Sequence, residues 1–407
     1  MDVVISKSKL SGHINAISSK SDAHRALICA ALGDKPCRIQ LGSMSDDIEA
    51  TAHVLSVLGA EIKRDGFSFL VKPVWNHLPE ECVLDCNESG STLRFLFPVA
   101  AALVPSVTFT GKGRLPQRPM EEICSVMRLN GCEIDRVLLP ISIKGLLKNG
   151  CFSLPGNVSS QYISGLLFAL PLLNGKSEIK ITSALESSSY INLTLQTMKK
   201  FGMEPERRDN GFLFSGDEHY VSPENYQVEG DWSNSAFWYA ARFLGADIAV
   251  DGLSENSMQG DKAVVKILDS FSLSGDLTVS AKEIPDLIPV LAVAACHRKA
   301  KTVFSDCQRL RLKESNRILS TCDMINALGG RAEGTEDSIC VYGTGALTGG
   351  AVDSVNDHRI AMSAAVASLI CEQNVTIKNA QAVNKSYPAF FDDFKKLGGN
   401  LNVIDVR

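Results

Sequence analysis

The 407-residue sequence has no long hydrophobic run and no excess of positive charge. Its two longest apolar stretches, residues 93–104 and 287–296, are too short to span a bilayer. The net charge is −5, which excludes a nucleic-acid binder that depends on overall basicity. The N-terminus lacks a basic segment followed by an apolar one, so no secretory signal is expected. We therefore expect a cytoplasmic chain with neither membrane nor nucleic acid as a partner.

Several short motifs of common sites are also missing. The twelve cysteines form no CxxC pair, and the seven histidines form no HExxH motif, so no metal site is expected. Neither a GxGxxG fingerprint nor a Walker A loop occurs. We expect most cysteines to be small apolar core residues in a reducing compartment.

The composition is that of a globular protein, and the chain is long enough for two domains. The sequence contains a repeated pattern. Each copy is an amphipathic helical stretch, usually a glycine, and then a strand-like run. Glycine suits the left-handed conformation that closes a helix. The closing residues are Gly59, Gly131, Gly202, Ser272, Gly329 and Gly398, with serine in the degenerate fourth copy.

The spacing of these residues indicates an internal repeat. The intervals are 72, 71, 70, 57 and 69 residues. Helix–glycine–strand junctions are common in α/β proteins, but six at similar spacing favour a repeat. Three units precede residue 216 and three follow it, and the polar segment 217–229 is the best linker candidate.

Polar groups recur at the predicted helix starts. At residues 18–31, Ser19 or Ser21 could cap a helix whose first turn carries Lys20 and Arg25. Positive charge there opposes the helix dipole, which suggests that an anion binds at this end. The alternative is a solvated helix start.

Seven further segments combine polar residues with a predicted helix start or lie beside one: 87–95, 117–120, 159–162, 284–289, 309–317, 356–362 and 384–388. Pro119 suits the first position of a helix and would place Arg118 just outside it. For Ser159 and Ser160 plain capping is an equal alternative, and for residues 309–317 a solvated helix face is the alternative. If the helix starts of both halves face one cleft, the site would bind small polyanions, with Asp286 and Glu314 left for proton transfer.

Eight motifs in order resemble those of the enolpyruvyl transferase family, and of the EPSP synthases within it. They are Lys20-Ser21-(x3)-Arg25, Ser89-Gly90-Ser91-Thr92-Leu93-Arg94, Arg118-Pro119-Met120, Ser159-Ser160-Gln161, Ile284-Pro285-Asp286, Arg311-Leu312-Lys313-Glu314-Ser315-Asn316-Arg317, Asn356-Asp357-His358-Arg359 and Lys385-Ser386-Tyr387-Pro388. The resemblance implies an α/β (α+β) fold of two similar domains, each of three βαβαββ-type units, with the active site in the interdomain cleft. The domains would be residues 13–226, and 1–12 with 227–407.

The implied reaction transfers the enolpyruvyl group of phosphoenolpyruvate to the 5-hydroxyl group of shikimate 3-phosphate and releases phosphate. It proceeds through a tetrahedral intermediate without a metal or organic cofactor. The implied shikimate 3-phosphate contacts are Lys20, Ser21, Arg25, Ser159, Ser160, Gln161, Ser187, Tyr190, Asp286 and Lys313. The implied phosphoenolpyruvate contacts are Lys20, Gly90, Arg118, Gln161, Arg317, Arg359 and Lys385.

The resemblance also implies the catalytic groups. Asp286 accepts the 5-hydroxyl proton and Glu314 protonates the methylene carbon, with Lys20 and His358 as further catalytic residues. We expect a monomer whose partners are these two small molecules.

The sequence departs from the family pattern at Ala23, His24, Ser91, Lys112 and Asn316. Asn316 leaves the orientation of Arg317 open. Two alternatives are a UDP-N-acetylglucosamine enolpyruvyl transferase and a catalytically inactive anion-binding relative. The first is disfavoured by Lys20-Ser21, where a Lys-Asn pair is expected, and by a loop at residues 111–117 without cysteine. The retained cations and both carboxylates argue against the second.

Overall fold

The computed structural model describes residues 1–404, and the chain forms two compact units. The N-terminal unit is Ser18–Val228, and the C-terminal unit is Met1–Ile17 with the chain from Glu229 onward. These boundaries lie a few residues after the expected ones at 12/13 and 226/227. β2 (Ser11–Asn15) pairs in parallel with β15 (Asp247–Asp251), which keeps residues 13–17 in the C-terminal unit.

The N-terminal unit contains three four-stranded sheets with orders β14-β3-β5-β4, β6-β7-β9-β8 and β10-β11-β13-β12. In each sheet the first two strands are parallel and the other pairings are antiparallel. The strands are β3 (Cys37–Gln40), β4 (Glu61–Asp65), β5 (Ser68–Lys72), β6 (Glu81–Asp85), β7 (Ser106–Thr110), β8 (Glu133–Ile134), β9 (Ile141–Lys144), β10 (Cys151–Leu154), β11 (Ser177–Ile181), β12 (Glu206–Arg208), β13 (Gly211–Phe214) and β14 (Asn225–Gln227).

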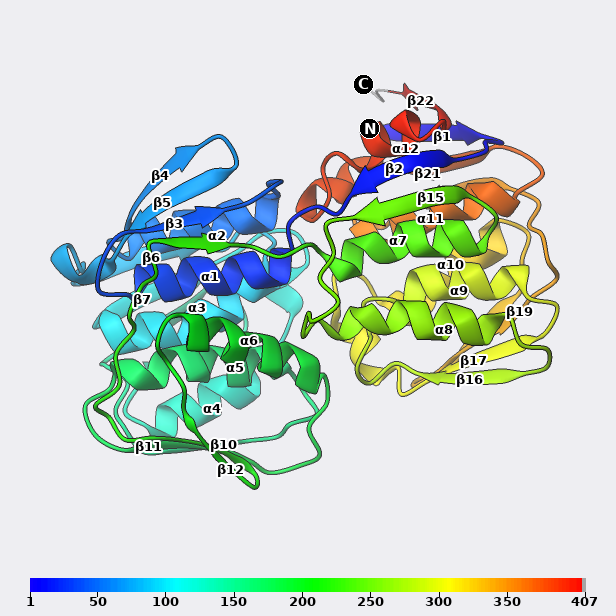
Figure 1. The fold of residues 1–407 in the computed structure, drawn as a ribbon. Helices are drawn as coiled ribbons and strands as arrows, with labels where there is room; N and C mark the ends of the chain where they lie inside the picture. The colour runs from blue at the N-terminus through cyan, green and yellow to red at the C-terminus, as the bar shows by residue number, and fades with distance from the viewer. Residues whose placement is uncertain (405–407) are drawn as a thin grey trace. The chain divides into compact units, whose positions relative to one another are not determined.

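Two helices accompany each of these sheets, and Figure 1 shows them lying inward of the strands. They are α1 (Lys20–Ala31), α2 (Asp46–Val57), α3 (Gly90–Leu103), α4 (Glu121–Leu129), α5 (Ser160–Ala169) and α6 (Ser188–Lys200). α1, α3 and α5 are buried on nearly all sides. Gly165 lets α5 pack against α3, because a Cβ atom there would lie 2.4 Å from the Arg94 carbonyl oxygen. The order of elements is the expected βαβαββ repeat, and β14 supplies the first strand of the first sheet.

The C-terminal unit has two four-stranded sheets, β16-β17-β19-β18 and β20-β21-β1-β22, and the two-stranded pair β15-β2. Its other strands are β1 (Asp2–Ser6), β16 (Leu277–Ser280), β17 (Lys301–Ser305), β18 (Ala332–Gly334), β19 (Ile339–Tyr342), β20 (Gly350–Asp353), β21 (Val375–Lys378) and β22 (Asn400–Ile404). Its helices are α7 (Trp232–Phe243), α8 (Val264–Phe271), α9 (Ile288–His297), α10 (Arg317–Ala327), α11 (His358–Ala367) and α12 (Phe390–Lys396).

The fourth repeat is incomplete. After α8 the chain enters β16, the first strand of the next sheet, without the antiparallel hairpin that follows α2, α4 and α6. This missing hairpin explains why the interval after Ser272 is 57 residues instead of about 70. The strand predicted after the degenerate copy therefore exists, but it belongs to the fifth unit.

Glycines close the helices of the other repeats as predicted. Gly59, Gly131, Gly202, Gly329 and Gly398 all have φ between +71° and +109°. Ser272 instead keeps a right-handed helical conformation, with φ −73°. Gly245, with φ +101°, closes α7 in the same way. It was not predicted, because the repeat pattern includes only one of the two helices in each unit.

Each unit has its own apolar core. The cysteines are free thiols, and all except Cys151 and Cys340 are buried, which confirms their predicted role as small core residues. Within residues 1–404, none of the helices has the length and apolarity needed to cross a membrane.

Candidate active site

The expected substrate contacts gather at helix starts within each unit. In the N-terminal unit they lie at the starts of α1, α3, α5 and α6, or just before α4. In the C-terminal unit they lie before α9, around the starts of α10 and α11, and in a short 3₁₀ segment that ends at Lys385.

The start of α1 is capped and carries an ion pair. Ser19 accepts a hydrogen bond from the Asp22 amide at 3.3 Å, so Ser19, not Ser21, is the cap. Lys20 Nζ lies 2.7 Å from Asp47 Oδ2, and both side chains are mostly buried. This pairing holds the ammonium group at the helix start against the unfavourable helix dipole.

Arg25 is buried one turn further along α1. Its guanidinium group donates to Thr194 Oγ1 at 2.8 Å and to the carbonyl oxygens of Ser21 and Tyr190 at 2.5 and 3.0 Å. It also lies 4.9 Å from the centre of the Phe95 ring. Burial lowers the pKa of Arg25 to about 10. Because all three acceptors are neutral, the positive charge remains available to an anion.

Two arginines meet at the start of α3. A Cβ atom on Gly90 would lie 2.6 Å from Arg118 Nη1 and 2.8 Å from Arg94 Nη1, so only glycine lets both groups approach. Arg94 Nη1 donates to Gln161 Oε1 at 2.9 Å, and Gln161 Nε2 donates to Ser91 Oγ at 2.9 Å. We call Gly90, Arg94, Arg118 and Gln161 the guanidinium cluster.

The predicted serines lie at two further helix starts. Ser159 caps α5 by accepting from the Gln161 amide at 3.3 Å, and Ser160 is the first residue of that helix. Ser187 precedes α6 with a left-handed backbone, φ +54°, and Tyr190 lies in the first turn. Capping by Ser159, an equal alternative from the sequence, is therefore present.

Asp286 stands two residues before α9 and faces three cations. Its Oδ1 lies 2.6 Å from Arg317 Nη1 and 3.2 Å from Lys313 Nζ, and its Oδ2 lies 3.8 Å from Arg359 Nη2. Burial disfavours the ionised carboxylate, but the three cations outweigh it and hold the pKa of Asp286 well below its usual range. The pKa of Lys313 is lowered by burial, against the opposing effect of Asp286.

Arg317, the first residue of α10, binds three carboxylates. Besides Asp286, it donates to Glu314 Oε2 at 2.7 Å and to Asp357 Oδ2 at 2.8 Å. Its side chain is 1% exposed, and these anions raise its pKa despite burial. We call Asp286, Glu314, Asp357 and Arg317 the carboxylate cluster. The alternative of a solvated helix face is wrong for this arginine.

The start of α11 completes this region. Asp357 is its N-cap and accepts from the Arg359 amide at 2.9 Å and from Ser315 Oγ at 2.9 Å. Arg359 donates to Ser233 Oγ at 2.7 Å, and Lys385 donates to the Asn356 carbonyl oxygen at 2.7 Å. These two acceptors lie in α7 and in the loop before α11.

His358 lies beside this cap. Its Nδ1 atom is 4.0 Å from Asp357 Oδ1, and its side chain is 3% exposed. Its proposed catalytic role is a prediction that these contacts leave open.

Sequence reasoning missed two residues of these clusters. Arg94 and Asp357 stand inside the quoted motifs but received no role. The signals were present, because Arg94 lies one helical turn after Gly90, and an aspartate directly before a helix is a frequent N-cap. The departure at Asn316 left the orientation of Arg317 open in the sequence analysis. In the structure, Arg317 is oriented by the three carboxylates of the cluster. The side-chain oxygen of Asn316 is buried and has no hydrogen-bond partner among residues 1–404.

One expectation about local structure was wrong. Pro119 is not the first residue of a helix, because α4 begins at Glu121 after the N-cap Met120. Arg118 instead ends a short 3₁₀ turn, and the Pro119 carbonyl oxygen accepts from the Tyr162 hydroxyl at 2.7 Å. This contact ties the Arg118 loop to α5.

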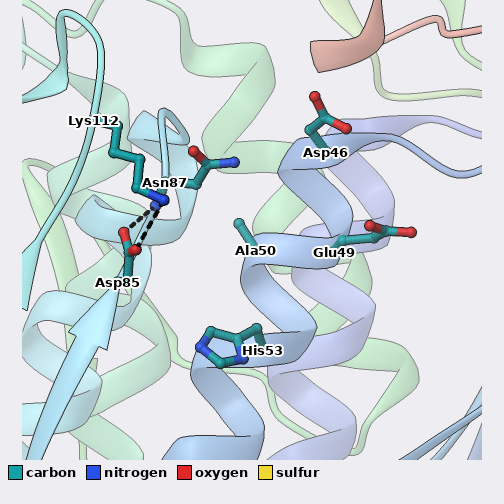
Figure 2. A pocket seen from close by; sticks show the side chains of 7 residues that line it. All are labelled: Asp46, Glu49, Ala50, His53, Asp85, Asn87 and Lys112. Carbon is teal, nitrogen blue, oxygen red and sulfur yellow. Dashed lines mark hydrogen bonds and ion pairs between the residues drawn. The ribbon is translucent and has the colours of Figure 1, made fainter.

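A surface pocket of about 240 Å³ in the N-terminal unit is separate from these residues. Figure 2 shows its lining: Asp46, Glu49, Ala50, His53, Asp85, Asn87 and Lys112. Lys112 Nζ and Asp85 Oδ2 lie 3.5 Å apart across one side of it. None of the expected substrate contacts lines this pocket. In the described part of the chain, no group of three or more His, Cys, Asp or Glu residues is arranged to hold a metal ion.

Comparison with known proteins shows the family of this chain. The sequence profile of EPSP synthase (3-phosphoshikimate 1-carboxyvinyltransferase) matches residues 4–394. The chain belongs to the EPSP synthase family. This establishes the family to which the eight motifs pointed.

Curated relatives of the EPSP synthase family match over nearly the whole chain. Proteins named 3-phosphoshikimate 1-carboxyvinyltransferase from Clostridium acetobutylicum and Clostridium perfringens are 40% and 42% identical. The alignments cover 97% and 98% of this chain and 96% and 99% of those proteins.

Solved structures agree in fold. EPSP synthase from Acinetobacter baumannii matches with a TM-score of 0.80 and 24% identity, covering 99% of this chain and 100% of that one. The enolpyruvyl transferase NikO from Streptomyces tendae matches with a TM-score of 0.77 and 16% identity, covering 98% of each chain. The predicted repeat architecture is thereby confirmed at the level of fold.

Proposed function

We propose that this protein transfers the enolpyruvyl group of phosphoenolpyruvate to the 5-hydroxyl group of shikimate 3-phosphate, within the pathway to aromatic amino acids. The products are 5-enolpyruvylshikimate 3-phosphate and phosphate. Near full-length membership of the EPSP synthase family carries this proposal. Retention of both carboxylates and all the expected cations supports it.

The N-terminal unit supplies groups that bind and orient the substrates. Lys20 and Arg25 would bind the phosphate group of shikimate 3-phosphate, together with Ser21, Ser159, Ser160, Ser187 and Tyr190. Gly90 and Arg118 would bind phosphoenolpyruvate, and Gln161 would contact both molecules. Arginine forks and free amide groups at helix starts suit phosphate and carboxylate groups.

The C-terminal unit supplies the proton chemistry. The oxygen of the 5-hydroxyl group attacks C2 of phosphoenolpyruvate while Asp286 takes the proton of that hydroxyl group. Glu314 delivers a proton to C3. The tetrahedral intermediate then loses a proton from C3 and expels phosphate from C2. Each positioned proton transfer is worth roughly 10²–10⁴-fold in rate. Lys313, Arg317, Arg359 and Lys385 would bind the anionic groups, with His358 beside them.

The carboxylate cluster couples this chemistry to substrate binding. With three cations around it, Asp286 is a weak base. Anionic groups of the substrates that bind these cations would offset their charge and raise the proton affinity of Asp286. We infer that Asp286 becomes an effective base only when the substrates are bound.

Phosphate release in the presence of both substrates tests the function. We expect turnover by the wild-type protein, no turnover when either substrate is omitted, and a large loss in Asp286→Ala. The thermal unfolding of this variant is compared with wild type to show that it folds. Turnover with UDP-N-acetylglucosamine instead of shikimate 3-phosphate would support the sister activity. Binding of both substrates without turnover would support an inactive relative.

A further inference from the structure

A buried chain of hydrogen bonds runs from His24 on α1 to Ser89, the N-cap of α3. His24 Nδ1 lies 2.6 Å from Thr51 Oγ1, which lies 2.7 Å from Thr92 Oγ1. Thr92 Oγ1 donates to Ser89 Oγ at 2.7 Å, and the Thr92 amide donates to the same oxygen at 3.2 Å. All four side chains are fully buried, so water does not compete for these bonds. We call these four residues the His24 relay.

The donors of the His24 relay can be assigned by counting protons. The single hydroxyl proton of Thr92 goes to Ser89, so Thr51 must donate to Thr92. The hydroxyl proton of Thr51 is then used, and Thr51 must accept from His24 Nδ1. His24 is therefore the tautomer protonated at Nδ1.

His24 stays neutral in this environment. Burial lowers its pKa well below the usual range, and the nearby charges of Lys20 and Arg25 lower it further. Its Nε2 atom is buried with no hydrogen-bond partner in the part of the chain that the structure describes. The ring packs edge-on against Phe95, with centroids 6.3 Å apart. Among residues 1–404, the ring therefore makes polar contacts on its Nδ1 side alone.

The relay ends directly beside the guanidinium cluster. Ser89 precedes Gly90, whose backbone lies against the guanidinium groups of Arg94 and Arg118. A cap that holds Ser89 also fixes the direction of the Gly90 amide group at the start of α3. Thr51 on α2 links His24 on α1 to this cap through its hydrogen bond with Thr92.

We propose that His24 is a positioning residue for phosphoenolpyruvate. Its Nδ1 proton, acting through Thr51 and Thr92, fixes Ser89 and thereby the Gly90 amide beside Arg118. This inference rests on the proposed function, in which Gly90 and Arg118 bind phosphoenolpyruvate. It assigns a role to a position at which the sequence analysis noted only a departure.

A pair of variants separates the donor of His24 from its volume. His24→Phe keeps a ring against Phe95 but removes the donor. His24→Asn keeps an N–H group the same number of bonds from Cβ but removes most of the ring. A residue that only fills space would be damaged more by asparagine, whereas a donor would be damaged more by phenylalanine.

We expect His24→Phe to raise the KM for phosphoenolpyruvate about tenfold, the effect of leaving one buried polar partner unsatisfied. Thr51→Val, which removes the middle hydroxyl without touching His24, should match it, and Thr51→Ser should behave as wild type. His24→Asn should keep the KM within about twofold, although it unfolds at a lower temperature. The KM for shikimate 3-phosphate and kcat should change little in every variant.

Hydrogen exchange gives a readout that does not depend on turnover. The Thr92 amide, which donates to Ser89, should exchange about tenfold faster in His24→Phe and Thr51→Val but not in His24→Asn. If wild type lacks the proposed activity, this measurement still tests the relay. Equal exchange and equal KM in Thr51→Val and wild type would overturn the proposal, as would a larger KM change in His24→Asn than in His24→Phe.

Discussion

The N-terminal and C-terminal units share a repeat, but Arg25 and Arg94 in the first have partners of a different kind from those of Arg317 in the second. In the N-terminal unit Arg25 donates to a hydroxyl and two carbonyl oxygens, and Arg94 donates to an amide. In the C-terminal unit Arg317 is surrounded by Asp286, Glu314 and Asp357. Neutral acceptors leave positive charge available to anions, whereas carboxylates consume it and can exchange protons. In the proposed function, arginines with neutral acceptors serve binding, and the carboxylates around Arg317 serve proton transfer.

The largest expected effect comes from removing the shared cation of the carboxylate cluster. Arg317→Met leaves the buried Asp357 and the partly buried Asp286 and Glu314 without their common partner, so both proton transfers lose their alignment. We expect kcat to fall about 10⁴-fold, the upper range for positioned acid–base groups, and the protein to unfold more easily. Steady-state kinetics and urea unfolding measure the two effects.

Arg331→Met is the matched control, because Arg331 pairs with Glu333 on the surface of the same unit. It should leave kcat unchanged. If the two variants behaved alike, the carboxylate cluster would have no special role.

A variant that removes only the proposed base should lose less activity than Arg317→Met. Asp286→Asn keeps the shape of the side chain but cannot accept the hydroxyl proton at the same site. We expect kcat to fall about 10³-fold while both KM values change less than about threefold. A loss confined to KM would assign Asp286 to binding and would remove the contrast between the units.

In the N-terminal unit the expected change lies in binding. Arg25→Met removes a buried guanidinium group held by Thr194 and two carbonyl oxygens. We expect the KM for shikimate 3-phosphate to rise about 30-fold, since charge-assisted hydrogen bonds contribute about 1.5–3 kcal/mol, with kcat largely kept. Arg25→Lys, which keeps the charge but not the planar fork, should be intermediate. A fall in kcat at constant KM would contradict this assignment.

The contrast extends to acid stability. The cations hold the pKa of Asp286 below its usual value of 3.8, so its ionised form stabilises the fold above that pH. This stabilisation is lost as the pH falls from about 4 through the lower folded-state pKa. Urea unfolding between pH 7 and pH 2 should show a smaller acid-induced loss in Asp286→Asn than in wild type. Parallel profiles would show that Asp286 does not contribute.

The smallest expected effect tests the repeat itself. Gly59→Ala places a Cβ atom 2.6 Å from the His77 carbonyl oxygen at φ +109°, and should cost about 1–3 kcal/mol. Gly245→Ala has similar strain, with φ +101°, but open space, and should cost about 1 kcal/mol. Ser272→Ala, in the incomplete repeat, should be nearly neutral because its backbone is already right-handed.

Chemical unfolding ranks these three variants. Equal costs at Gly59 and Ser272 would mean that the two helix ends are closed in the same way, against the observed backbone angles.

Local signals predicted much of the fold. Five helix ends carry glycine and a sixth carries serine. The residue type at such a position reflects the backbone conformation of that residue alone, so the sequence shows it directly. Gly245 was not predicted because it closes α7, a helix that the repeat pattern does not include. The incomplete fourth repeat was visible as a short interval, but its cause was not. Whether a strand joins the hairpin of one sheet or begins the next depends on pairing between distant segments.

The candidate residues were found for the same reason, since each motif lies at a helix start that the sequence marks. Their partners were not. Arg94 contacts Gln161 across 67 positions of the chain, and Arg317 contacts Asp357 across 40. No local pattern states which of several cations will bind a given carboxylate.

The sequence by itself therefore determined the repeat, the helix starts, the family and the residue types at the site, because these depend on short-range conformation and on the order of motifs. Tertiary structure alone decided that Arg317 binds three carboxylates, that Arg25 keeps neutral partners, and that His24 reaches Ser89 through two threonines. Hydrogen bonds and ion pairs form between atoms within about 3 Å, and only the folded chain brings such distant residues that close.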